Sequence, residues 1–105
     1  MKVTIAHNRS QQEVMGVVDR SLDDTFKAMG VGLIQVTDVK KTWQDNIMNF
    51  SLMAKAGFLN APIRGTVLVT GTDVTIDADL GLLGKFISDD KAKSLIEGRV
   101  KGLIT

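Results

Sequence analysis

The sequence contains no cysteine and no tyrosine, and it has only one proline, one histidine and one tryptophan among 105 residues. Without cysteine the chain can form no disulfide, no thiolate nucleophile and no cysteine-based zinc site. It has no run approaching the ~20 apolar residues of a membrane span, and no block of basic residues suited to nucleic acid. The N-terminus lacks the apolar core of a signal peptide. We therefore expect a cytoplasmic protein with no membrane span and no nucleic-acid partner.

The composition is that of an ordinary globular protein, with 44% hydrophobic and 24% charged residues and a formal net charge of +1. A chain of this length buries roughly 65% of the surface that its unfolded form exposes, which is enough for one core. We therefore expect residues 1–105 to form a single domain without repeats.

Two segments have the periodicity of amphipathic helices. The first begins with a capping box from Ser10 to Glu13 and ends at Gly30, which predicts a helix over 11–29. The second follows Ser88, the expected cap, and has acidic residues in its first turn. The expected buried stripes are Val14, Val18, Leu22, Phe26 and Met29 in the first helix, and Ala92, Leu95, Ile96, Arg99, Val100 and Leu103 in the second.

The remaining segments alternate apolar and polar residues as strands do. Expected strands cover residues 2–7, 33–43, 48–55, 63–70 and 74–80, with a loop over 56–62. The alternation in the second strand breaks near Thr37-Asp38, which indicates a bulge. A two-residue turn at Gly71-Thr72 would fix the register of the last two strands. The predicted pairs are Val69–Val74, Val67–Ile76, Gly65–Ala78, Thr66–Asp77 and Arg64–Asp79.

The order of elements is β-α-β-β-β-β-α, which predicts an α+β fold. Four consecutive strands with short connections form an antiparallel meander, and the first strand adds at an edge or beside the fifth. Each helix and the sheet have one apolar side, so both helices are expected on one face of a five-stranded antiparallel sheet.

The sequence contains few candidates for catalysis. His7 could be a general base, but no neighbouring residue is an obvious partner for its ring, and a structural role is more common. Asp77 and Asp79 share one strand face and could bind a metal, although pairing with Thr66 and Arg64 across the strands explains them already. We therefore expect no enzyme activity, no cofactor and no metal.

Two connections contain unexpected apolar side chains. Loops are normally polar, so these residues either fold inward to close the ends of the core or form an exposed apolar contact surface. The sequence leaves both alternatives open. The candidate ligand- or surface-binding residues are Phe58, Leu59, Leu82, Leu83, Phe86 and Ile87.

Several landmarks follow the same order as in a family of small bacterial proteins. They are His7 before a helix, Trp43-Gln44-Asp45 leading to Phe50, Gly65 with Val67, Val74 leading to Leu80-Gly81-Leu82-Leu83, and a closing helix. With them the chain resembles the polyhydroxyalkanoic acid system family, from which it departs over residues 55–62. The resemblance implies an association with storage-polyester metabolism, and names no catalytic residue. The element order is also similar to a trimmed helix-grip fold, which often holds apolar ligands between helix and sheet.

These observations lead to two expectations for function. The first is a non-enzymatic bacterial protein that binds an apolar ligand or a hydrophobic surface such as a polyester granule. The alternative is a structural or interaction module that forms a homodimer, through the sheet edge or the apolar loops, and has no small-molecule ligand.

Overall fold

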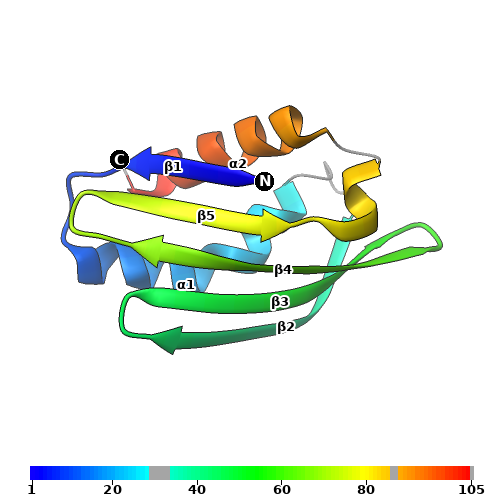
Figure 1. Cartoon of the computed structure of the whole chain (residues 1–105), viewed down its shortest axis with the longest axis horizontal. Coiled ribbons are helices and arrows are strands. Elements are labelled where there is room, and N and C mark those ends of the chain that lie inside the picture. Colours follow the sequence, from blue (N-terminus) through cyan, green and yellow to red (C-terminus); the bar gives the residue numbers. More distant parts are fainter. Residues whose placement is uncertain (29–33, 86–87, 105) are drawn as a thin grey trace.

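The computed structural model describes residues 1–28, 34–85 and 88–104, which form one sheet and two helices (Figure 1). The five strands are antiparallel and lie in the order β1-β5-β4-β3-β2, so the predicted α+β fold is confirmed and the first strand pairs with the fifth. Both helices lie on the same side of the sheet (Figure 1). The elements are β1 (Lys2–Ala6), α1 (Gln11–Ala28), β2 (Ile34–Gln44), β3 (Ile47–Ala56), β4 (Leu59–Val69), β5 (Asp73–Asp79), the 3-10 helix η1 (Gly81–Lys85) and α2 (Asp89–Ile104).

The core is built from alternate residues on one face of the sheet. Partners such as Val3 and Ile76, or Met48 and Val67, lie opposite each other and are both buried. The residues between them point to the other face, where the Thr4 and Thr75 hydroxyl groups lie 3.1 Å apart in a hydrogen bond. The helices cover only the apolar face, so the hydrophobic effect defines an inner and an outer side of the sheet.

The register of β4 and β5 is the one that the alternation predicts. All five predicted pairs are present, from Arg64 opposite Asp79 to Val69 opposite Val74. Thr70 and Asp73 close the turn, since the Thr70 N–H donates to the Asp73 carbonyl at 2.9 Å. Because a slip of one residue would move every side chain to the opposite face, the pattern of burial fixes this register.

A bulge interrupts β2 where the alternation breaks. The pairing with β3 shifts between Thr37 and Lys40, and Asp38 has a positive φ of 54°. The shift places Trp43, opposite Met48, on the same inner face as Val36, which lies opposite Ala54 before the bulge. The predicted bulge is therefore confirmed, and it determines which face each of the later residues of β2 occupies.

The predicted loop over 56–62 is wrong. Strand β3 continues to Ala56 and β4 begins at Leu59, so that only Gly57 and Phe58 form the turn. Gly57 takes a positive φ of 63°, a conformation that glycine adopts without steric cost. Pro62 fits inside β4 because pairing with β5 begins only at Arg64, so no β5 residue requires the missing N–H.

The helices begin where the caps predict. The Ser10 hydroxyl accepts from the Glu13 N–H at 3.2 Å, and the Ser88 hydroxyl accepts from the Lys91 N–H at the same distance. In α1, Val14 and Val18 are buried as expected. The expected stop at Gly30 lies outside the described residues.

The predicted stripe of α2 needs two corrections. Arg99 is exposed, and the fully buried residues follow a strict four-residue spacing that includes Ile104. An arginine can keep its head in water while its stem covers apolar surface, which makes its place in a stripe hard to judge from spacing. The buried residues of α2 are Ala92, Ile96, Val100 and Ile104.

Candidate functional site

The most exposed large hydrophobic side chain is at the tip of the β3–β4 hairpin. Phe58 is 100% exposed, and the hairpin carries it beyond the end of β5 (Figure 1). The neighbouring Leu59 is half-buried and lies opposite Ala56 on the inner face. Of the two alternatives for this segment, Phe58 therefore forms exposed apolar surface, whereas Leu59 is half-buried on the inner face.

The second predicted apolar segment lies at the same end of the sheet. Its residues Gly81–Lys85 form η1, which lies at the end where β5 stops (Figure 1). Leu82 in η1 is 44% exposed. A Cβ atom on Gly81 would lie 3.0 Å from the Pro62 carbonyl oxygen, so η1 contacts the base of the hairpin. Phe86 and Ile87 lie outside the described residues, as does the side chain of Leu83. The structure thus brings Leu82 close to the hairpin that carries Phe58.

The opposite end of the sheet is polar and closed by hydrogen bonds. The Val69 carbonyl oxygen accepts two side-chain amide donors, from Gln11 and Asn46, each at 2.8 Å. Thr70 uses its hydroxyl to accept from the Asp73 N–H at 2.9 Å. The two ends therefore differ in degree, because this end satisfies its polar groups by internal hydrogen bonds and exposes Ile47 to 39%, whereas the other end presents the fully exposed Phe58.

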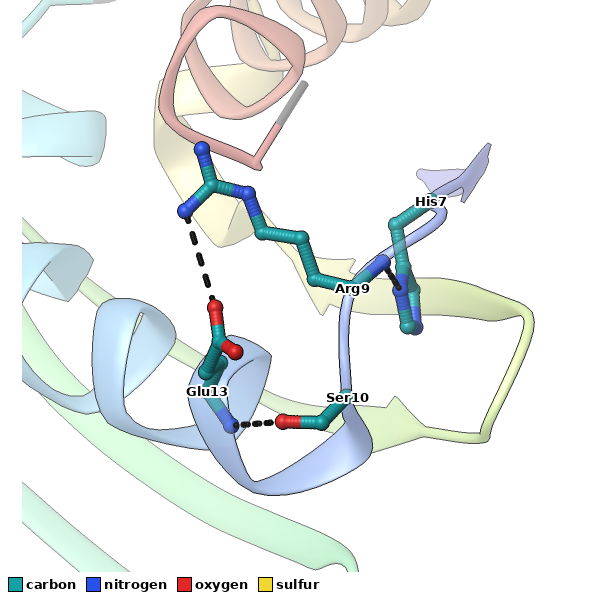
Figure 2. A network of polar contacts seen from close by, with 4 residues as sticks. All are labelled: His7, Arg9, Ser10 and Glu13. Atoms are coloured by element: carbon teal, nitrogen blue, oxygen red, sulfur yellow. Dashed lines mark hydrogen bonds and ion pairs between the residues drawn. The ribbon is translucent and has the colours of Figure 1, made fainter.

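His7 lies in the polar end, in the connection from β1 to α1 (Figure 2). Its Nε2 donates to the Thr70 carbonyl oxygen at 2.9 Å when its Nδ1 accepts from the Arg9 N–H at 3.2 Å. The side chain is buried, and both ring nitrogens are engaged by backbone groups. Arg9 and Glu13 approach to 3.9 Å beside it, so the Glu13 carboxylate faces Arg9 and completes no capping box (Figure 2). The imidazole therefore has a structural role, because its hydrogen bond to the Thr70 carbonyl oxygen joins the end of β1 to the β4–β5 turn.

The aspartates of β5 have separate surroundings. Asp79 accepts from the Gly81 N–H through its Oδ1 at 3.0 Å, which ends β5 and starts η1. Although Arg64 lies opposite Asp79 in the sheet, the expected ion pair is absent, since no nitrogen of Arg64 comes within 4.0 Å of a carboxylate in the described part of the chain. Among the same residues, no three histidine or acidic side chains gather as metal ligands would.

A hollow on the outer face of the sheet is not evident in the sequence. It measures about 180 Å³ and lies beside the β2 bulge, at the base of the β3–β4 hairpin. The sequence indicates this hollow only through the predicted bulge, because the bulge makes Lys40 face outward beside Ser51. The lining residues are Asp38, Lys40, Ser51, Leu52, Met53, Pro62, Ile63 and Arg64.

No protein-family model matches the sequence, and neither a curated protein nor a solved structure shows significant similarity to it. No helix in the described ranges is long and apolar enough to cross a membrane.

Proposed function

We propose that the protein is a non-enzymatic binding module that attaches to an apolar surface through the tip of its β3–β4 hairpin. The observation that supports this most directly is the complete exposure of Phe58. A phenylalanine in a two-residue turn contributes nothing to the core, and its exposure to water is unfavourable. Its position is explained if another apolar surface covers it.

The hairpin suits reversible attachment. Burying a phenylalanine side chain stabilises by about 1.5–3 kcal/mol, so one such anchor gives weak binding unless neighbours add to it. Leu82 lies at the same end of the sheet and supplies further apolar surface. Lys55 and Lys85 are exposed near these residues in the chain and can keep their charged ends in water beside an apolar phase.

The absence of an evident reaction centre in the described residues also supports a binding role. The only histidine has both ring nitrogens engaged by backbone groups. Asp77 and Asp79 are both exposed, and Asp79 accepts the Gly81 N–H. General acid–base catalysis requires a side chain that can reach a substrate proton. We therefore propose attachment without catalysis.

For the surface itself, the resemblance to the polyhydroxyalkanoic acid system family favours a storage polyester in a bacterial cytoplasm. A polyester surface is an extended apolar phase, to which a projecting aromatic side chain can bind without a preformed pocket. A homodimer joined through the same tip is the competing possibility. Joining through a sheet edge is less favourable, because β1 has only five residues and β2 is bulged and bears Lys40 and Lys41.

Co-sedimentation with particles of amorphous poly(3-hydroxybutyrate) tests the proposal. We expect the native chain to sediment with the particles, and Phe58→Ser to reduce the bound fraction several-fold without changing the unfolding midpoint. Ile47→Ser is the matched control, because Ile47 is 39% exposed but lies in the turn region at the opposite end of the sheet. Equal loss in both variants, or no binding by the native chain, would contradict the proposal.

Sedimentation velocity over a concentration series distinguishes the competing homodimer. The proposal predicts a monomer at all concentrations at which particles are bound. A dimer that dissociates upon Phe58→Ser, together with no particle binding, would assign the hairpin tip to self-association.

A further inference from the structure

We propose that the hollow on the outer face of the sheet binds a short-chain aliphatic carboxylate. The site lies at the base of the hairpin and is separate from the tip on which the proposed surface attachment depends. Two cations and two apolar side chains, Lys40, Arg64, Met53 and Pro62, surround the hollow.

The cations and a hydroxyl group form one row across three strands. Lys40 lies opposite Ser51, and Ser51 lies opposite Arg64, so the two cations flank the serine on neighbouring strands. Adjacent strands are about 4.8 Å apart, which separates the backbones of Lys40 and Arg64 by about 10 Å. Long side chains can converge over that distance on one carboxylate, with the Ser51 hydroxyl below as a further donor.

These cations form no ion pair with a described residue, although Asp38 lines the same hollow. Neither Lys40 nor Arg64 has a carboxylate oxygen within 4.0 Å, and the carboxylate opposite Arg64 accepts the Gly81 N–H through its Oδ1. The segment 46–72, which includes the whole β3–β4 hairpin, contains no aspartate or glutamate. An arginine in such surroundings is available for a bidentate interaction with an external anion.

The next row along the strands consists of Thr37, Met53 and Pro62, of which Met53 and Pro62 are apolar and line the hollow. Met53 lies opposite Pro62, two residues from Ser51 and Arg64 on the same face. Two residues of a strand span about 6.8 Å, which is the length of a short aliphatic chain whose carboxylate lies in the cationic row. The arrangement therefore fits a ligand with one charged and one apolar end.

The size and charge of the hollow narrow the ligand class. The hollow is open to solvent and has a volume of about 180 Å³, so it has room for a group about the size of benzene, which occupies an enclosed cavity of about 150 Å³. The lining contains Lys40, Arg64 and Asp38, which sum to a charge of +1, and Asp79 lies opposite Arg64 on the neighbouring strand. A monoanion matches this charge, whereas a phosphate dianion would place its second charge near Asp38.

Titration of the isotope-labelled protein with butyrate, followed through backbone amide chemical shifts at constant ionic strength, tests this inference. We expect saturable shifts centred on Lys40, Ser51, Met53 and Arg64. The uncharged isostere butyramide is expected to give no saturable shift, and inorganic phosphate is expected to bind more weakly than butyrate. Shifts that rise linearly without saturation, or that butyramide reproduces, would overturn the inference.

Single-residue variants show which positive charge, that of Arg64 or that of Lys40, is needed to bind butyrate. Arg64→Gln is expected to weaken butyrate binding at least tenfold, and Lys40→Gln to weaken it in the same direction. The matched control is Arg99→Gln, which removes an exposed arginine from α2, the helix on the other side of the sheet. Phe58→Ser should leave butyrate binding unchanged, so failure of surface attachment and failure of this site are separable. Retained affinity in Arg64→Gln, or equal loss in Arg99→Gln, would contradict the assignment.

Discussion

At the scale of single residues, Gly65 is the position where the sheet tolerates the least change. It lies in β4 between Phe50 and Ala78, and a Cβ atom there would be 2.8 Å from the Phe50 ring and 2.9 Å from the Ala78 Cα. It would also collide with the Asp77 carbonyl oxygen, which belongs to the backbone of the neighbouring strand. The space above the glycine is filled by the aromatic ring, so the two residues form one packing unit.

We therefore predict that Gly65→Ala lowers the free energy of unfolding by about 3 kcal/mol, the upper part of the range for overpacking, because backbone cannot move aside as a side chain can. Urea unfolding followed by circular dichroism measures this. Gly71→Ala is the matched control, since a Cβ atom there would meet no atom within 4 Å. A change in Gly65→Ala no larger than in Gly71→Ala would show that β4 and β5 are not packed as described.

At the scale of elements, α1 is joined to β2 by a polar contact at the margin of the core. The Trp43 indole Nε1–H donates to Asp19 Oδ1 at 3.0 Å, and the Lys41 ammonium donates to the Asp19 carbonyl oxygen. Trp43 and Lys41 both face inward because the bulge shifts the register of β2. The contact of Asp19 with Lys41 and Trp43 therefore depends on the bulge, and it connects α1 to the edge strand β2.

Replacing Asp19 by alanine should cost about 1 kcal/mol, the usual value of one hydrogen bond, and should alter the emission of the only tryptophan. Asp19→Asn keeps an Oδ1 acceptor for the indole and is expected to retain most of the stability and the native emission. Thermal unfolding followed by tryptophan fluorescence tests both variants. Indistinguishable emission in Asp19→Ala and the native chain would mean that the indole hydrogen bond does not form.

The elements also show how far sequence alone leads. The β4–β5 register follows from strict alternation on both faces, and the bulge from a break in alternation at Thr37-Asp38. The turn at Gly57-Phe58 does not follow from the sequence, because a proline is unusual inside a strand and only the stagger of β5 explains why Pro62 fits in β4. The hollow depends on three strands placing Lys40, Ser51 and Arg64 in one row, which no single segment encodes.

At the scale of the whole molecule, the sheet has a covered inner face, an exposed outer face and two unlike ends. The polar end is closed by the His7, Gln11 and Asn46 side chains, whose donors meet backbone carbonyls. The apolar end presents Phe58 and Leu82. The full exposure of Phe58, together with this difference between the two ends, leads to the proposal that the molecule attaches to an apolar phase by one end.

The most direct test follows the hairpin tip itself. In a Trp43→Phe, Phe58→Trp double variant, the only tryptophan reports the surroundings of position 58. Before particles are added, its emission should be that of an indole in water, because position 58 is fully exposed. With poly(3-hydroxybutyrate) particles, we expect the emission maximum to move to shorter wavelength and the tryptophan to be protected from iodide quenching. Particle-bound protein whose tryptophan still emits and quenches as in water would contradict the proposal.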